Sequence, residues 1–160
     1  MFTQPCYIQI NTKKLRSELE RLGYQLFASY NTDADCIYCF DGYYWPKYLS
    51  DCKDSAESVK RDLGINVIFC GDNEEAFLSI AGLCDDRTIY QKYVIDEDGE
   101  YYPDYAQTSD AYPVFFEKGD IVDFDDEALT HCEHHKAKIN ELMEYYGLDE
   151  GTSRHKDVIY

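Results

Sequence analysis

The sequence predicts an α+β fold, in which a single domain holds a mixed or antiparallel sheet with two or three covering helices. The chain has 160 residues, of which 44% are hydrophobic and 16% aromatic, enough to bury one core. Segments with the helical apolar period alternate with strand-like segments at first, and hairpin patterns dominate later. No internal repeat or linker interrupts this pattern.

The first two elements have clear signals. Residues 6–10 alternate in the period of a half-buried strand. The segment that follows places its leucines on one helical stripe, with Asn11 or Thr12 as the N-terminal cap and Gly23 at the end. A strand followed by an amphipathic helix is therefore expected at the start of the chain.

A hairpin is the next strong signal. Residues 36–40 and 43–45 are rich in aromatic and β-branched side chains and flank Asp41-Gly42, a dipeptide typical of two-residue hairpin turns. Residues 25–30 are a shorter strand candidate. The sequence thus predicts at least two paired strands before residue 46.

The middle of the chain predicts a helix, a strand and a second helix. The first helix covers residues 55–63 and ends at Gly64. Residues 65–70 form the most apolar strand pattern, for which we expect a central place in the sheet. Asp72 or Asn73 then caps a helix whose buried face comprises Ala76, Phe77, Ile80, Ala81 and Cys84.

The last part predicts a second hairpin and a long helix. Residues 88–95 and 100–102 flank the turn-like segment Asp-Glu-Asp-Gly, and the helix runs from Asp126 to Tyr146. The predicted domain covers residues 1–148, and residues 149–160 are predicted to be a flexible C-terminal tail.

Three segments also resemble a known family. They are CYIQINTKKLRSELERLGY, VIFCGDNEEAFLSIAGLCDD and HKAKINELMEYY, together about a third of the chain. They resemble an uncharacterised family of small acidic proteins from gut Bacteroides-type bacteria, their phages and mobile elements. The resemblance implies a phage or mobile-element setting and carries over no catalytic residue.

The charge of the chain restricts its partners. The net charge is −17, so direct binding to nucleic acid or to an anionic membrane is opposed by repulsion. Residues 96–127 contain twelve acids against one base, Lys118. Such concentration of charge indicates a partner with a basic surface, although a merely soluble acidic protein explains the overall composition equally well.

Acids and aromatic residues occur together in this acidic window. Tyrosine offers a large contact area with little rotamer entropy to lose, which favours binding surfaces. We expect part of the segment to pack inward, namely Val114, Phe115, Phe116, Ile121 and Phe124. The predicted partner-binding residues are Asp96, Asp98, Glu100, Tyr101, Tyr102, Asp104, Tyr105, Asp110 and Tyr112. A loop packed by its own aromatic side chains, with a solvated acidic rim, is the alternative.

The segment Thr-His-Cys-Glu-His-His-Lys raises the question of a metal site. On the predicted helix, His131 and His135 stand four residues apart and could share one ion, but zinc needs three or four ligands. Cys36 and Cys39 would point to opposite faces of a strand. A core or capping role for the histidines is therefore favoured, and no metal or other cofactor is predicted.

The cysteines predict neither a disulfide framework nor a catalytic site. Seven scattered cysteines suit reduced thiols in the cytoplasm, and the N-terminal residues do not match a signal peptide. Cys70 precedes a helix start, where a thiolate would be stabilised, with His135 as a base if the fold brought it near. A buried strand cysteine is the favoured interpretation.

These observations predict a non-enzymatic acidic interaction protein of a phage or mobile element. It would bind a basic surface of a host protein, as a nucleic-acid mimic or as an inhibitor of host defence. A small-ligand or metal-binding module built on His131 and His135 is the second hypothesis, and an enzyme is the third. The sequence predicts no oligomeric state.

Overall fold

The computed structural model describes residues 4–27, 33–83, 89–103 and 112–150. The described chain has the predicted α+β fold, and the mixed sheet is also confirmed. The chain divides into two compact units. The main unit comprises residues 1–88 and 139–160, and the inserted unit comprises residues 89–138. The predicted boundary of a single domain at residue 148 stays a prediction.

The main unit is built on a mixed six-stranded sheet. Its strands, in spatial order, are β11 (Asp149–Glu150), β5 (Ile68–Phe69), β1 (Cys6–Ile8), β3 (Cys36–Phe40), β4 (Tyr43–Lys47) and β2 (Gln25–Leu26). The β1–β5 and β2–β4 pairs are parallel, and the other pairs are antiparallel.

The first hairpin is confirmed. Phe40 on β3 pairs with Tyr43 on β4, so Asp41 and Gly42 alone make the turn. Both turn residues have positive φ, 52° and 84°, as a two-residue hairpin turn of this type requires. The prediction succeeded because every residue that determines this turn is local in the sequence.

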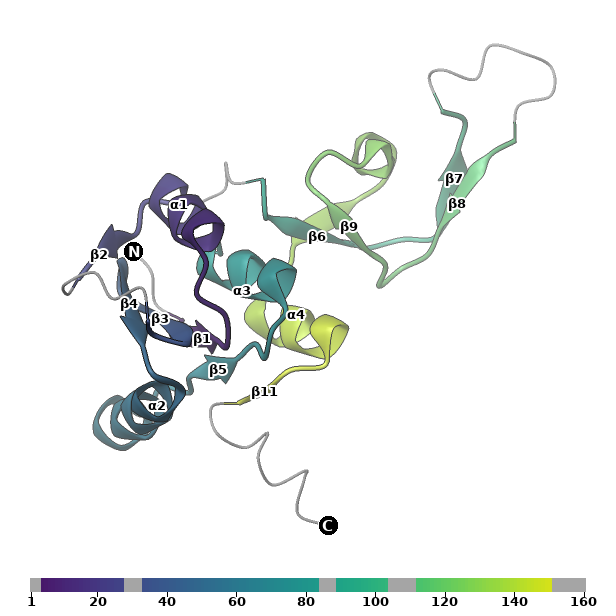
Figure 1. The fold of residues 1–160 in the computed structure, drawn as a ribbon. Helices are drawn as coiled ribbons and strands as arrows, with labels where there is room; N and C mark the ends of the chain where they lie inside the picture. Colours follow the sequence, from purple (N-terminus) through teal and green to yellow (C-terminus); the bar gives the residue numbers. More distant parts are fainter. Residues whose placement is uncertain (1–3, 28–32, 84–88, 104–111, 151–160) are drawn as a thin grey trace. The chain divides into compact units, whose positions relative to one another are not determined.

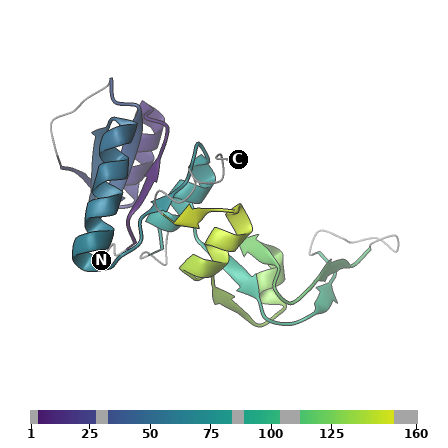
Figure 2. The same ribbon diagram turned by 90° about the horizontal axis from the view of Figure 1, so that it is seen from below.

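Helices cover both faces of this sheet (Figures 1 and 2). The α2 helix (Leu49–Leu63) packs on one face, where Tyr7, Tyr38 and Phe69 are buried. The helices α1 (Lys13–Arg21) and α3 (Glu74–Ala81) belong to the opposite layer, and α4 (Ile139–Tyr146) packs against α3. Strand alternation explains the two layers, because successive side chains of β1 and β3 point to opposite faces.

The caps of these helices agree with those predicted from the sequence. The Thr12 hydroxyl accepts a hydrogen bond from Leu15 N at 3.1 Å, and the Asn73 side chain accepts one from Ala76 N at 3.0 Å. Gly64 ends α2 in the left-handed conformation. The α2 helix begins at Leu49, earlier than predicted.

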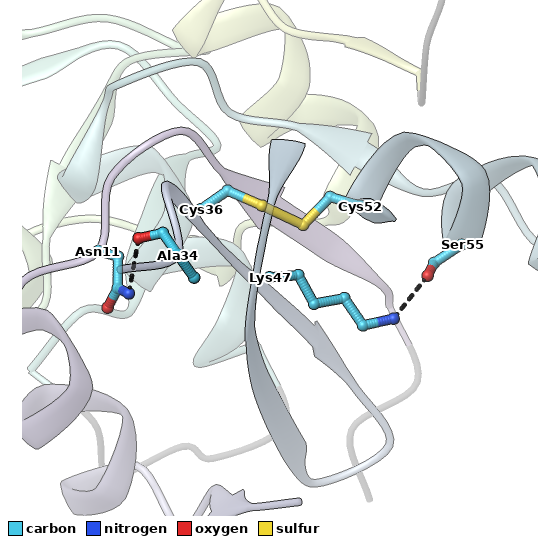
Figure 3. Close-up of a disulfide and its surroundings, with 6 residues drawn as sticks. All are labelled: Asn11, Ala34, Cys36, Lys47, Cys52 and Ser55. Atoms are coloured by element: carbon cyan, nitrogen blue, oxygen red, sulfur yellow. Dashed lines mark hydrogen bonds between the residues drawn. A yellow bond between two sulfur atoms is a disulfide. The ribbon is translucent and has the colours of Figure 1, made fainter. Parts of the chain in front are cut away.

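A disulfide joins α2 to the sheet. Cys36 on β3 and Cys52 on α2 are bonded, and Lys47 on the neighbouring strand β4 donates a hydrogen bond to Ser55 on α2 at 2.8 Å (Figure 3). The prediction that all the cysteines are free thiols is therefore wrong. Cys39 remains a free thiol. The bond was missed because strand and helix meet only in the folded chain.

The apolar strand at residues 65–70 is shorter and less central than predicted. Only Ile68 and Phe69 form β5, which lies between β1 and the edge strand β11. Asp149 and Glu150 form that edge strand, so these first two residues of the predicted tail belong to the sheet. The rest of the predicted tail lies outside the described residues.

The inserted unit contains two small sheets and a short 3-10 helix. Its elements are β6 (Lys92–Ile95), β7 (Gly99–Tyr101), β8 (Val114–Phe116), β9 (Ile121–Asp123), η1 (Glu127–Thr130) and β10 (His134–Lys136). One sheet has the order β10-β6-β9, and β7 pairs with β8 in the other. Figure 1 shows β7 and β8 side by side. Ile95, Phe116 and Ala128 form the core of the unit.

The second predicted hairpin is wrong. The segment at β6 pairs with β9 and β10, whereas β7 pairs with β8. Two of the acids between β6 and β7 accept hydrogen bonds from backbone groups of later segments instead of closing a turn. Asp98 accepts a hydrogen bond from Lys118 N at 2.8 Å, and Glu97 accepts one from Glu133 N at 2.6 Å.

The long helix from Asp126 to Tyr146 is also wrong. It divides into η1, β10 and α4. Asp126 caps η1 by accepting a hydrogen bond from Ala128 N, and β10 pairs with β6 so that His135 stands opposite Val94. Pairing with a distant strand outweighed the helical apolar period of this segment.

Within the described residues, no helix combines the length and the apolar character that a membrane crossing requires.

Candidate functional site

The β7–β8 hairpin holds the central part of the acidic window. Its cross-strand pairs are Gly99 with Phe116, Glu100 with Phe115, and Tyr101 with Val114. Residues directly opposite each other in antiparallel strands share a face, and neighbouring pairs alternate between faces. The Glu100–Phe115 pair therefore lies on one face, here called the outward face, and the other two pairs lie on the inner face.

The inner face packs on the core of the inserted unit. The Phe116 side chain is buried, and its ring lies over Gly99. Tyr101 packs against Phe116, and the ring of His131 stacks on Tyr101 with 4.6 Å between centroids and 9° between planes. Tyr101, predicted to contact a partner, is thus half-buried and engaged in packing within the chain.

The outward face exposes an acid beside an aromatic ring. Glu100 is exposed, and Phe115 is 72% exposed. Tyr102 and Tyr112, at the hairpin ends of the two strands, are 59% and 83% exposed. Of the predicted partner-binding residues, Asp98, Glu100, Tyr102 and Tyr112 are therefore exposed to a partner.

The expectation of inward packing fails for three of the five apolar side chains. Phe116 is buried and Ile121 is half-buried, but Val114, Phe115 and Phe124 are exposed at 39%, 72% and 44%. Strand alternation gives the reason for the neighbours Phe115 and Phe116, because one of two successive side chains must face away from the core.

Several acids of the window have structural partners. Asp98 and Asp126 accept hydrogen bonds from backbone amides, and Asp120 accepts one from Glu117 N at 2.8 Å. Asp123 forms an ion pair with Lys92, whose side chain is buried. Some of the acids in the window thus form interactions within the fold. The predicted residues Asp104, Tyr105 and Asp110 lie outside the described residues.

The predicted residue Asp96 binds a histidine. Its Oδ1 lies 2.8 Å from Nδ1 of His135, and both side chains are a little over one third exposed. His131, in contrast, stacks on Tyr101. The two histidines are therefore held by different partners, and the helix that would have placed them together is absent. Among the described residues, no group of three or more His, Cys, Asp or Glu side chains has the geometry to hold a metal ion.

A cluster of three thiols in the main unit was not predicted. Cys6 and Cys39 are directly opposite each other on β1 and β3, and both they and Cys70 are buried. Burial raises the pKa of the Cys39 thiol. Burial also opposes ionisation of Cys6, but hydrogen bonds with Cys39 and Cys70 lower the pKa of Cys6 to about 5. The pairing of β1 with β3 brings Cys6 opposite Cys39, and the sequence alone does not show that pairing.

Cys70 is buried, as predicted, but it lies one residue beyond β5 and not in the strand. Its side chain is only 1% exposed, and the thiols of Cys6 and Cys39 are its neighbours. A nucleophile must reach its substrate, so burial argues against a catalytic thiol at this position.

Comparison of the chain with protein-family models, with curated proteins and with solved structures finds no match.

Proposed function

We propose that the chain is a non-enzymatic interaction protein that binds a basic surface of another protein through the outward face of the β7–β8 hairpin. The observation that supports this most is the exposure of Phe115 beside Glu100, with Tyr102 and Tyr112 exposed at the hairpin ends of the two strands. Burial of exposed rings of this size under a partner would contribute favourable free energy to binding.

The negative charge of the chain indicates what kind of surface it would bind. A net charge of −17 attracts basic surfaces at long range, and carboxylates on the hairpin attract lysine and arginine at short range. A partner that normally binds nucleic acid would have such a basic surface, so the chain would act as a nucleic-acid mimic. The setting that we propose is the cytoplasm of a bacterial host, with the chain encoded by a phage or mobile element and inhibiting host defence. This setting follows from the family resemblance.

The alternative of a metal- or ligand-binding module loses its geometric basis. It required His131 and His135 on one helix face, whereas His131 stacks on Tyr101 and His135 lies on β10 beside Asp96.

The proposal is tested by matched neutralisation. Asp98→Asn with Glu100→Gln removes two charges from the hairpin, and Asp98→Asn keeps an oxygen that can accept from Lys118 N. The control, Glu20→Gln with Asp54→Asn, removes two exposed charges from the main unit. Proteins captured from bacterial lysate would be identified by mass spectrometry, and their affinities measured at low and high salt.

The hairpin variant should bind about fivefold more weakly at low salt, as expected for the loss of about 1 kcal/mol from exposed ion pairs. The loss should shrink at high salt because mobile ions screen exposed charges. Equal affinities of the hairpin variant and the control variant at low salt would exclude this surface as the binding site.

A further inference from the structure

A shallow hollow lies on the hairpin, at the end away from Tyr102 and Tyr112. The residues that line it are Asp98, Gly99, Glu100, Phe115, Phe116, Glu117 and Lys118. Three negative groups against one positive group give the hollow a negative charge. A cationic group is therefore the complementary occupant.

Strand geometry explains how these side chains come together. Glu100 and Phe115 are cross-strand partners, so their β-carbons lie about 5 Å apart on one face. Asp98 precedes Glu100 by two residues, and Glu117 follows Phe115 by two residues. A spacing of two in extended chain returns to the same face. Phe115 thus lies opposite Glu100, and Asp98 and Glu117, each one residue beyond its strand, line the same hollow.

An exposed ring flanked by carboxylates distinguishes arginine from lysine. The guanidinium group is planar, stacks on aromatic faces and can donate two parallel hydrogen bonds to one carboxylate. The lysine ammonium is a strongly hydrated point charge, which makes stacking on a ring less favourable for it. At this hollow, arginine can use the ring and a carboxylate together.

We propose that the hollow binds an arginine side chain of the partner protein, with the guanidinium group against the Phe115 ring and hydrogen-bonded to Glu100. This inference rests on the proposed function, and it adds the side chain that is recognised. Phe115 is the residue that gives selectivity, and the surrounding acids supply general attraction for any cation.

The test uses two capped peptides of equal length and charge, hexa-arginine and hexa-lysine, titrated into the full chain at fixed salt. The wild-type chain should bind hexa-arginine about twofold to fivefold more tightly, the range expected for stacking of a cation on an exposed ring. Phe115→Leu should remove the preference and leave the affinity for hexa-lysine unchanged. Phe124→Leu, at another exposed ring of the same unit, is the control and should keep the preference.

The outcomes separate the two proposals. If both peptides bind wild type equally, or if Phe115→Leu keeps the preference, the arginine site is refuted while binding of a basic surface stands. If neither peptide binds at low salt, both proposals fail. Because Phe115 is exposed, its replacement removes little buried area, and a circular dichroism spectrum would check that the fold is intact.

Discussion

Replacing Gly99 with alanine should strain the core of the inserted unit. A β-carbon at this position would lie 2.6 Å from Cζ and 2.9 Å from Cε1 of Phe116. Carbon atoms in contact are ordinarily about 3.5–4.0 Å apart, so the ring must move by roughly 1 Å. The Phe116 side chain is buried in the core of the inserted unit, which leaves the ring few directions in which to move.

The size of the effect follows from two limits. A small shift of the ring with slight repacking costs about 1 kcal/mol, the lower end for an overpacked core. Expulsion of the ring into solvent would cost about 3 kcal/mol, the transfer free energy of a fully buried phenylalanine. Gly99→Ala should therefore lower the free energy of unfolding by about 1–3 kcal/mol.

A double-mutant cycle isolates the clash. Phe116→Leu removes the ring at a cost of its own, but Gly99→Ala should cost little in that background, so the two effects should be less than additive. Urea unfolding, followed through the amide signals of β6 in NMR spectra, would measure all four proteins. If Gly99→Ala were as stable as wild type, or if the two effects added fully, the proposed packing of Phe116 on Gly99 would be wrong.

Three other predictions concern the main unit. Thr12→Ala should lower the free energy of unfolding by about 1 kcal/mol, because Leu15 N loses its cap, and unchanged urea unfolding would contradict this. Burial chiefly raises the pKa of Tyr7 to about 12, so the stability that its neutral phenol contributes is present below about pH 10 and is lost as the pH rises toward 12. In Tyr7→Phe the free energy of unfolding should therefore fall less steeply between pH 9 and 12 than in wild type. An equally steep fall in both proteins would refute the raised pKa of Tyr7. Alkylation of the unfolded chain should label two fewer cysteines before reduction than after it, and reduction should cost about 3 kcal/mol for a loop of this length, whereas equal labelling would exclude the Cys36–Cys52 bond.

The elements that were predicted correctly depend on neighbouring residues. The turn at Asp41-Gly42 and the caps at Thr12 and Asn73 each involve groups within three residues of one another. Gly64 ends its helix for an equally local reason, its left-handed conformation. For such features the sequence contains both partners of the interaction within one short window.

The elements that were missed depend on pairing between distant segments. His135 stands opposite Val94, and Asp98 binds Lys118 N, so both segments take their structure from partners far along the chain. The apolar period at residues 129–146 and the turn composition at residues 96–99 are true local signals that these pairings override. For the candidate site, the sequence identified the acidic and aromatic composition. Which ring faces outward required the register of β7 and β8.

The division into two units has a consequence for synthesis of the chain. Residues 89–138 separate α3 from α4, the two helices that pack together in the main unit, and β5 from its edge partner β11. A ribosome must therefore complete the whole inserted segment before the last layer of the main unit can form. Until then β5 presents an open edge, and its apolar surface is a site for transient pairing with other nascent chains. Replacement of residues 89–138 by a short flexible linker would shorten that interval, and refolding of the shortened chain should be faster because the loop to be closed is smaller.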